Sequence, residues 1–441
     1  MQTRLELPAG TEVVAVGAPD SAGRLIGKRV PAERWPVIVE QGLPMPNYHL
    51  VTGIENRPQE GFEVTGAHLG YPNGLLLPCL ETLRALPWEP GTAIVIGDVR
   101  DASRQPVEQA PRRVLQRQIE RLNSAGLTAT FASELEFYLF RYSFAEARTR
   151  HSRLPEPSYH LHADNDILIA GYDEGFVRDV RRAMHAMEIP VDATQGEGGQ
   201  GQHEINLRHA DPVRMADRHV YYKHGVRALA HARGQAVTFM AKISADAPGS
   251  SCHVHLCLYG PDGEPAFGVD DLSPLGQSFL AGLLAYTPEL TLLHAPYANS
   301  YRRLRPGSFA PSNATWGWDN RSCMVRVVGR GEACRFEFRV PGADANPYHT
   351  FAAIIAGGLA GTERGLEPPH PVSGNAYAQA GAQDLPTDLT EALAAFSQSD
   401  VATRAFGPAV HRHLTTLGEH EREAGLAVVT DWELSRGLEN A

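Results

Sequence analysis

Cysteine is scarce in this chain. The 441 residues contain five cysteines, an odd number, and none has the Cys-x-x-Cys spacing of zinc or redox motifs. Small secreted scaffolds that depend on disulfides carry many cysteines, in even number. The sequence therefore argues against such a scaffold and against structural zinc, and it predicts reduced thiols.

Long apolar runs are also missing. No uninterrupted apolar stretch approaches the length of about 20 residues that a membrane-spanning helix needs, and residues 1–6 lack the apolar core of a signal peptide. These absences predict a cytoplasmic protein that does not bind a membrane. The net charge of −11 disfavours nucleic acid as a partner and weakly favours cationic small molecules.

Internal repeats and disordered tails are absent as well. The length of 441 residues, with 43% hydrophobic and 21% charged residues, predicts a globular protein of two domains. Strands expected at 13–16, 24–30 and 93–96 indicate a small β-rich N-terminal domain over residues 1–105. Residues 106–441 would form the second domain. Its strands come in runs flanked by helices, which is typical of an α+β fold.

Residues 133–140 alternate apolar and polar side chains, as a half-buried strand does. One face of this strand would carry Glu134 and Glu136 side by side. Like charges at this separation repel, and a carboxylate withdrawn from water is costly unless a cation compensates it. The pair predicts a bound cation. A surface strand with a solvated polar face is the alternative.

The Gly-rich segment 196–204 supplies two further carboxylates, Glu197 and Glu204. Its glycines allow the backbone to approach a ligand closely. The segment is not a dinucleotide-binding fingerprint, because the spacing differs and no helix follows within the motif. Taken alone, it could equally be a loop with solvated glutamates.

Two histidines, His253 and His255, fall on one face of the strand expected at 252–258. An imidazole is a good ligand for a divalent metal, and a second one at this spacing could contact substrate. The same pair occurs in metal-dependent hydrolases, and packed or surface histidines would need no function. The pair alone therefore leaves these interpretations open.

Another alternating stretch, 335–339, places Glu337 between Arg335 and Arg339 on one strand face. Guanidinium groups around a carboxylate suit a site that binds metal together with phosphate or carboxylate oxygens, although a cross-sheet salt-bridge ladder is the alternative. Further arginines gather upstream around a Pro/Gly loop and indicate an anionic ligand: Arg302, Arg303, Arg305, Arg321 and Arg326. Carboxylate-rich sites suit Mg²⁺ or Mn²⁺, and metals with arginines serve phosphoryl transfer. The residues therefore predict an ATP-dependent enzyme that acts on a carboxylate.

Together these segments resemble the glutamine synthetase family. The matching segments follow the family's order: Ser-Glu-Leu-Glu-Phe at 133–137, Gly-Glu to Gly-Gln-His-Glu at 196–204, Gly-Ser-Ser-Cys-His-Val-His-Leu at 249–256, Asn-Ser-Tyr-Arg-Arg-Leu at 299–304, Asn-Arg-Ser at 320–322 and Arg-Phe-Glu-Phe-Arg at 335–339. Because these segments, from residue 133 to 339, all match in the family's order, the resemblance is specific and outweighs the hydrolase alternative.

The resemblance implies a role for each candidate site residue. It implies two sets of ligands for two or three Mg²⁺ or Mn²⁺ ions: Glu136, Glu197 and Glu204 in the first set, and Glu134, His253 and Glu337 in the second, which would bridge the phosphates of ATP. It further implies glutamate-binding residues His255, Arg303 and Arg339, catalytic residues Arg321, Arg326 and Glu337, and ATP-binding residues Arg326 and Arg335.

The resemblance also implies the fold and the assembly. The N-terminal domain would be a small β-grasp, and the catalytic domain a curved antiparallel sheet with helices behind it. Members of the family form homo-oligomers of stacked rings, so a dodecamer with active sites between neighbouring subunits is expected.

Two departures from the ammonia-using members indicate a different amine. Those enzymes carry a glutamate in the loop after Asn-Ser-Tyr-Lys-Arg, whereas here residues 306–311 place Phe309 there. Their Asp-Gly-Ser-Ser segment, which contributes an ammonium-binding aspartate, is also missing. A phenyl ring cannot accept a proton, so we predict a larger, partly apolar amine. The candidate amine pocket is Phe309 with Trp316 and Trp318, the tryptophans acting through cation–π contacts.

The segments 306–311 and 339–345 are similar to the γ-glutamylpolyamine and related γ-glutamylamide synthetases. The resemblance implies an ATP-dependent ligase in which glutamate attacks ATP and an amine then displaces phosphate from γ-glutamyl phosphate. The amine would be a polyamine, another alkylamine or ethanolamine. An ordinary glutamine synthetase that uses ammonia, and an inactive family member that serves as a binding scaffold, are the alternatives.

Overall fold

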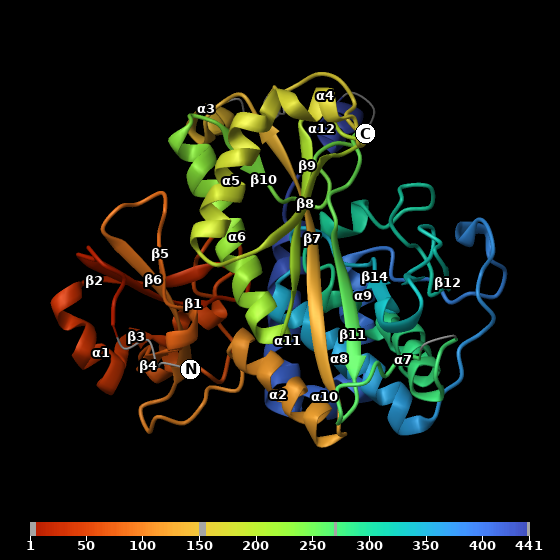
Figure 1. Ribbon diagram of the computed structural model, residues 1–441, viewed down its shortest axis with the longest axis horizontal. Coiled ribbons are helices and arrows are strands. Elements are labelled where there is room, and N and C mark those ends of the chain that lie inside the picture. Colours follow the sequence, from red (N-terminus) through yellow and green to blue (C-terminus); the bar gives the residue numbers. More distant parts are fainter. Residues whose placement is uncertain (1–5, 150–155, 269–270, 439–441) are drawn as a thin grey trace.

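The computed structural model describes residues 6–149, 156–268 and 271–438. A smaller β-rich part, formed by the first hundred residues, lies beside a larger part in which helices pack around a long curved sheet (Figure 1). Most of the buried apolar residues of each part form a hydrophobic cluster of their own. This arrangement agrees with the α+β architecture expected from the sequence.

The N-terminal part, where described, contains a six-stranded sheet of order β2-β1-β6-β4-β3, with β5 paired to β6. Its elements are β1 (Val13–Pro19), β2 (Leu25–Pro31), α1 (Trp35–Gln41), β3 (Leu43–Pro46), β4 (Asn73–Pro78), β5 (Arg84–Ala85) and β6 (Thr92–Arg100). β1 and β2 form the expected hairpin, and β1 runs parallel to β6. The predicted domain boundary at residue 105 falls between β6 and the next helix and stays a prediction.

The larger part contains, in its described residues, an eight-stranded sheet of order β12-β13-β14-β11-β7-β9-β8, with β10 paired to β7. Its strands are β7 (Thr128–Phe140), β8 (Val191–Gly196), β9 (Gln202–Ala210), β10 (Ala236–Thr238), β11 (Cys252–Tyr259), β12 (Trp316–Trp318), β13 (Val325–Val328) and β14 (Arg335–Phe338). Except for the parallel pair β12 and β13, the pairings within this sheet are antiparallel.

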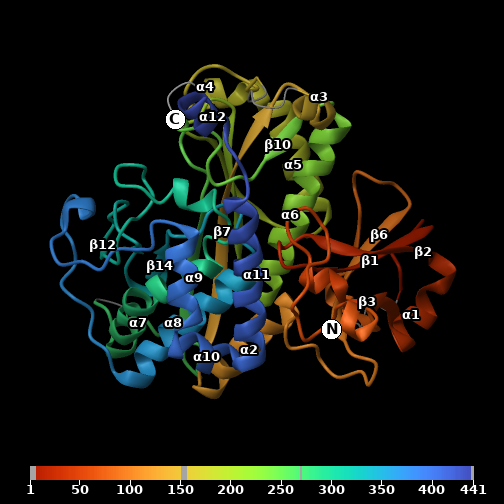
Figure 2. The same ribbon diagram turned by 180° about the vertical axis from the view of Figure 1, so that it is seen from behind.

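Helices cover much of this sheet. They are α2 (Pro111–Ser124), α3 (Phe144–Thr149), α4 (Ile167–Ala170), α5 (Glu174–Ala186), α6 (Pro212–Ala232), α7 (Pro274–Leu290), α8 (Pro347–Arg364), α9 (Leu389–Ser397), α10 (Asp400–Phe406), α11 (Pro408–Leu426) and α12 (Asp431–Gly437). The ring of Phe351 in α8 lies 5.0 Å from that of Phe131 in β7. Figure 2 shows α8, α9 and α11 together on the reverse side of the molecule. Among the described helices, none combines the length and apolar character needed to cross a membrane.

The two faces of β7 differ as its alternating sequence predicts. Leu135, Phe137 and Leu139 are fully buried in the core, so the period of two sends Glu134 and Glu136 to the opposite face. The register of the neighbouring strands then brings distant residues to that face. The facing pairs are Glu134 with His253, Glu136 with Glu204, and His255 with Glu337.

Contacts with distant parts of the chain decide some local features. Asp173 stands at the start of α5 but makes no capping bond, because its carboxylate instead accepts a hydrogen bond from Nε2 of His203 at 2.8 Å. The stretch between α7 and β13 contains the short strand β12, which pairs with β13.

Candidate active site

A polar cavity of about 490 Å³ opens on the glutamate-bearing face of the eight-stranded sheet. This volume is within the usual range for small-molecule sites. Most of the predicted site residues line it: Glu134, Glu136, Glu197, Glu204, His253, Arg303, Phe309, Arg321, Arg326, Glu337 and Arg339. Tertiary folding thus brings side chains from widely separated segments of the sequence into one cavity.

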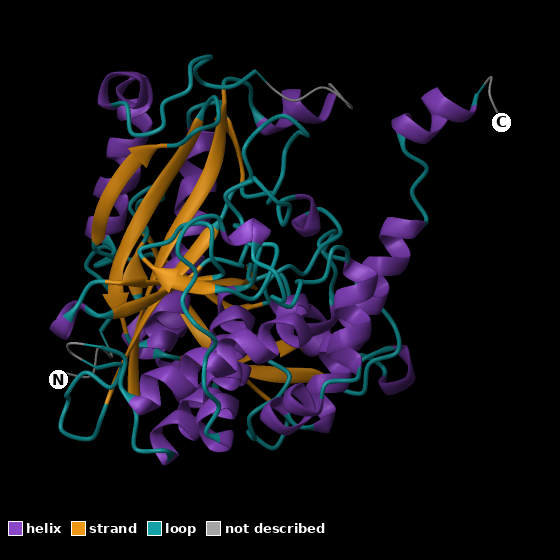
Figure 3. Cartoon of the chain, turned by 90° about the vertical axis from the view of Figure 1, so that its right-hand side faces the viewer, coloured by secondary structure: helices purple, strands orange, loops and turns teal. Residues whose placement is uncertain are grey.

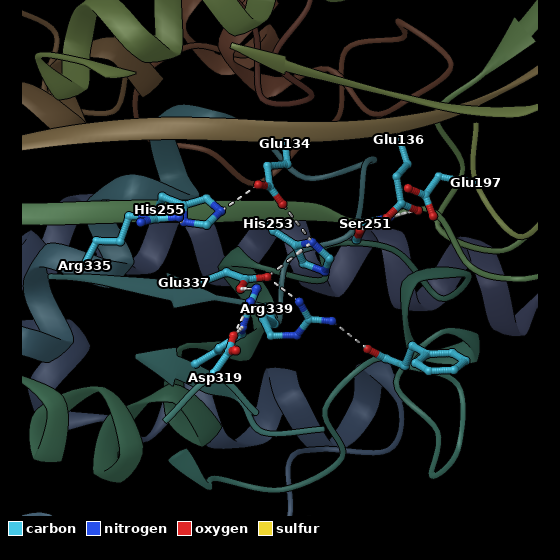
Figure 4. A network of polar contacts seen from close by, with 12 residues as sticks. Glu134, Glu136, Glu197, Ser251, His253, His255, Asp319, Arg335, Glu337 and Arg339 are labelled. Atoms are coloured by element: carbon cyan, nitrogen blue, oxygen red, sulfur yellow. Dashed lines mark hydrogen bonds and ion pairs between the residues drawn. The ribbon is translucent and has the colours of Figure 1, made fainter. Parts of the chain in front are cut away.

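Glu136 is held from several directions at one end of the cavity. Its Oε2 accepts hydrogen bonds from the backbone N–H of Ser251 and from Nε2 of Gln202, each at 3.0 Å, and its Oε1 accepts one from the Ser251 hydroxyl. Figure 4 shows Glu197 next to this carboxylate. Burial and the charge of Glu197 raise the pKa of Glu136 to about 7.

Glu197 and Glu204 complete the first predicted set of metal ligands. Burial is the main cause that raises the pKa of Glu197. Burial and the charges of Glu134, Glu136 and Glu197 raise the pKa of Glu204 well above its usual value. Carboxyl groups in this condition gain strongly from a bound cation, which would relieve both burial and repulsion.

The second predicted set surrounds His253. Its Nδ1 lies 3.4 Å from Oε2 of Glu134 and 3.7 Å from Oε1 of Glu337 (Figure 4). Burial and the neighbouring charge of Arg339 lower the pKa of His253 to about 4, so its imidazole is neutral near pH 7 and able to act as a ligand. Burial opposes ionisation of Glu337, but Arg339, His253 and His255 outweigh it and lower the pKa of Glu337 to about 2.

The donor set fits divalent metal ions. Ligand atoms of Glu134, Glu204 and His253 all lie within 4.8 Å of one another, and so do those of Glu134, His255 and Glu337. Carboxylate oxygens with one imidazole are suited to Mg²⁺ or Mn²⁺. The grouping of the individual ligands into two sets remains a prediction.

His255 and Arg335 are predicted site residues that do not line the described cavity wall. His255 Nε2 lies 2.8 Å from Oε1 of Glu134, and Arg335 Nε donates to Nδ1 of His255 at 3.1 Å, as Figure 4 shows. Because Nδ1 accepts, the imidazole donates through Nε2, and this chain of contacts orients Glu134. Their predicted contacts with glutamate and ATP stay predictions.

Arginines surround Glu337 and the adjoining cavity wall. Arg326 Nη1 donates to Oε2 of Glu337 at 2.8 Å, and Arg339 Nη1 donates to Oε1 of the same carboxylate. Arg303 is buried and donates to the carbonyl oxygens of Val340 at 2.8 Å and of Arg339 at 3.1 Å. Burial lowers the pKa of Arg303 to about 10, which leaves the guanidinium charged near pH 7. The cavity therefore offers cations for anionic substrates.

Phe309 stands on the cavity wall with 78% of its surface exposed. Its backbone lies in the left-handed region, with φ of 61°, which is uncommon for a bulky residue. The loop is fastened by Ser308, whose hydroxyl donates to the carbonyls of Arg303 at 2.7 Å and Arg305 at 2.6 Å. Arg339 Nη2 also donates to the Phe309 carbonyl at 3.2 Å. These bonds hold an apolar ring at the mouth of a polar cavity.

The two tryptophans of the predicted amine pocket lie elsewhere. Trp316 is 6% exposed, and its indole N–H donates to the carbonyl of Pro369 at 2.7 Å. Trp318 lies under the guanidinium of Arg330, 5.6 Å from the ring centroid. Neither is among the described residues that line the cavity. In this structure Trp316 therefore serves packing, and Trp318 already has a cationic partner.

Sequence reasoning gave no individual role to three cavity residues, Gln202, Ser251 and Asp164. Gln202 and Ser251 donate hydrogen bonds to Glu136. They lie next to His203 and Cys252 within the segments that resemble the family, and this position was the sequence signal for a role in the site. The backbone N–H of Asp164 donates to the carbonyl of Glu197 at 3.0 Å. No pattern around Asp164 in the sequence pointed to this contact.

Comparison with known proteins decides the family of this fold and site. Residues 108–437 match the family model described as glutamine synthetase, catalytic domain. The chain belongs to the glutamine synthetase family. The family and fold predicted from the sequence are therefore confirmed.

Several relatives match most of the chain. A γ-glutamylethanolamide synthetase of Streptomyces coelicolor is 39% identical over 430 residues, which cover 97% of this chain and 93% of the relative. A glutamate–isopropylamine ligase of a Pseudomonas species is 34% identical over 436 residues, covering 97% and 95%. The glutamine synthetase of Thermus thermophilus is 36% identical over 360 residues, covering 78% and 79%.

Solved structures share the fold over nearly the full chain. GmaS in complex with ADP superposes with a TM-score of 0.85 at 26% identity, covering 98% of this chain and 97% of that chain. A structure described as a novel glutamine synthase homologue gives 0.82 at 25% identity and covers 98% of both chains. The likeness therefore includes the N-terminal part, which lies outside the catalytic-domain match.

Magnesium should stabilise the folded protein through the cavity glutamates. A ligand that binds only the folded state at about 100 times its Kd contributes about 2.7 kcal/mol, so Mg²⁺ added to chelator-treated protein should raise the unfolding temperature. Glu136→Gln and Glu204→Gln should reduce that shift, whereas Glu33→Gln, at an exposed site outside the cavity, should keep it. Equal shifts in Glu204→Gln and the unaltered protein would contradict the assignment.

Proposed function

We propose that this chain joins the γ-carboxylate of glutamate to a primary amine other than ammonia, at the expense of ATP. The observation that carries the proposal is the cavity itself, in which glutamates, one imidazole and arginines meet the exposed ring of Phe309. Two relatives that match 97% of the chain are named for joining glutamate to amines, ethanolamine in one case and isopropylamine in the other.

The metal ions would be Mg²⁺ or Mn²⁺, two or three per site. Glu136, Glu197 and Glu204 would hold one, and Glu134, His253 and Glu337 another. Once bound, the ions would neutralise and orient the phosphates of ATP. Hydrogen bonds from Ser251 and Gln202 to Glu136, and from His255 to Glu134, support these carboxylates in fixed positions.

The chain's own cations would serve the two reacting substrates. Arg321, Arg326 and Arg335 would face the phosphates, and Arg303, Arg339 and His255 would bind glutamate.

The γ-carboxylate attacks the γ-phosphate of ATP, which gives γ-glutamyl phosphate and ADP. The amine, after losing a proton, attacks the acyl carbon, and phosphate leaves as the amide forms. Preorganised charge of this kind typically contributes about 100- to 1000-fold in rate for each well-placed group.

Phe309 would set the class of amine. A phenyl ring offers no lone pair or charge to ammonium, but it can pack against an alkyl group. An amine with an alkyl portion, such as an alkylamine, ethanolamine or a polyamine, therefore suits this mouth of the cavity better than ammonia does. Ordinary glutamine synthesis would require a carboxylate that the loop 306–311 does not contain.

The enzyme would act in the cytoplasm as a homo-oligomer of stacked rings, a dodecamer with each active site between neighbouring subunits. One feature supports a second copy as partner. The C-terminal segment extends from the body (Figure 3) and exposes apolar side chains: Leu426, Val428, Val429, Trp432, Leu434 and Leu438.

Product detection tests the function directly. The protein incubated with ATP, Mg²⁺, glutamate and a panel of amines should release phosphate and form a γ-glutamylamide that mass spectrometry identifies. Glu337→Ala should lower the rate by about 100- to 1000-fold, because a ligand of the metal ion that would orient the reacting phosphate is lost. Glutamine as the main product would replace the proposal with ordinary glutamine synthesis. Intact ATP with every acid and amine tested would favour a binding role.

Phe309→Ala should raise the KM for the preferred amine about tenfold, since burying such a ring against an alkyl group contributes about 1.5–3 kcal/mol. The KM values for glutamate and ATP should stay unchanged, because the alanine keeps the backbone carbonyl that Arg339 binds. Trp318→Leu is the matched control and should leave the amine KM as it is. Steady-state kinetics with each substrate varied would measure these values, and an unaltered amine KM in Phe309→Ala would remove the ring from the pocket.

The double variant Trp432→Asp, Leu434→Asp should lower the molar mass in solution. Burying two charged side chains in an apolar contact between copies would cost more free energy than the contact contributes to assembly. Glu419→Ala, at an exposed polar position of α11, is the control. Light scattering after size-exclusion chromatography gives the mass, and a double variant that assembles like the unaltered protein would exclude this segment from the assembly.

A further inference from the structure

A second cavity, of about 410 Å³, lies where the N-terminal part meets α6. It shares no described lining residue with the active-site cavity. Tyr221 of α6 marks the junction, because its hydroxyl donates to the carbonyl of Thr82 at 2.9 Å. Figure 1 shows the small β-rich part and α6 next to each other at this point. The cavity is thus formed jointly by two parts of the chain.

Four arginines line this cavity: Arg84, Arg112, Arg214 and Arg218. Arg112 is buried and fully engaged, since Nε and Nη2 donate to the two oxygens of Asp217 at 3.1 Å each and Nη1 pairs with Asp98. The carboxylates of Asp217 and Asp98 thus outnumber this single guanidinium, and Arg112 offers no free charge to a ligand.

Two of the remaining arginines have partners as well. Arg84 Nε donates to the carbonyl of Met187 at 2.7 Å, and its Nη2 lies 3.4 Å from Oε2 of Glu188. Arg214 Nη2 lies 3.8 Å from Oε2 of Glu81, whose carboxylate is exposed. These contacts, at the rim of the cavity, hold the guanidinium groups of Arg84 and Arg214 in place.

Arg218 is different, because it has no hydrogen-bond or ion-pair partner among the described residues. It is half-buried in the middle of α6. Burial and the like charges of Arg214 and Arg84 lower its pKa. A guanidinium carries five donors, and one that is partly withdrawn from water is costly without an acceptor. The guanidinium of Arg218, which Arg214 and Arg84 repel, would therefore be stabilised by a bound anion.

The third carboxylate of the cavity does not supply this charge. Asp211 accepts hydrogen bonds from the backbone N–H groups of Val213 at 3.0 Å and Arg214 at 3.3 Å at the start of α6. Its carboxylate therefore caps the helix. Asp217 is engaged with Arg112, and Glu81 lies on the exposed rim.

We propose that this second cavity binds a small anion that carries a phosphate or carboxylate group, with Arg218 as its main ligand and Arg214 and Arg84 beside it. Guanidinium groups bind such oxygens through paired hydrogen bonds. The anion would connect Arg84 of the N-terminal part with α6. The anion would also contact α6 one residue before His219, whose Nδ1 lies 3.0 Å from the hydroxyl of Ser133. Ser133 immediately precedes Glu134 in the sequence. The site shares no described lining residue with the active-site cavity and is therefore separate from the proposed ligase chemistry.

Calorimetric titration of the full chain with inorganic phosphate, pyrophosphate and citrate, at constant ionic strength, tests the site and distinguishes phosphate from carboxylate ligands. Arg218→Gln should weaken binding of the preferred anion at least about tenfold, as expected for loss of a charged hydrogen-bond partner. Arg218→Lys, which keeps the charge but not the fork, should lie between the two. Arg182→Gln, an exposed arginine on α5 outside both cavities, should bind like the unaltered protein.

Any anion binding in the active-site cavity is common to all these variants, so only the difference made by Arg218 reports on the second cavity. The unfolding temperature of Arg218→Gln without ligand, matched to that of the unaltered protein, would show that the variant is folded. Isotherms that coincide for the unaltered protein and Arg218→Gln with all three anions would overturn the proposal. This outcome is independent of ligase activity, so it would leave the proposed function intact.

Discussion

Mutual repulsion among five glutamates on one face of the catalytic sheet must be compensated in the folded protein. Glu134 and Glu136 reach this face because β7 alternates, and antiparallel pairing adds Glu204 and Glu337, while a Gly-rich turn adds Glu197. Burial makes each charge more costly than it would be in water. The arginines around the cavity, and the metal ions that its ligands fit, both compensate the repulsion among these glutamates.

The protein compensates the two ends of the cavity differently. Around Glu337, the charges of Arg339, His253 and His255 lower the pKa and keep the carboxylate ionised. Around Glu136, by contrast, hydrogen bonds from Ser251 and Gln202 are not enough, and burial with the charge of Glu197 raises its pKa. The carboxylates around Glu136 have fewer protein cations near them. Their ionised form therefore depends more on a bound metal ion than that of Glu337 does.

The scaffold and the specificity of the cavity are separate features. The sheet fixes most of the glutamates through backbone pairing, whereas the proposed amine side depends on the loop 306–311. That loop is tied down by Ser308 and by the bond from Arg339 to the Phe309 carbonyl. A family with one phosphoryl-transfer site can thus accept different amines when only the side chains of such a loop change. The cavity around Arg218, at the junction of α6 and the N-terminal part, is a further element that the shared chemistry does not require.

The sequence by itself determined the alternation of β7, the family and most of the charged residues that line the cavity. These are local patterns or ordered motifs, which survive without knowledge of distant contacts. Only the tertiary structure decided the strand register that sets His253 opposite Glu134, the packing of Trp316 against Pro369 and the isolation of Arg218. Each of these depends on which remote residues fold beside a side chain. The short-range periodicity of a sequence does not carry that information, because long-range pairing is settled by the packing of the whole chain.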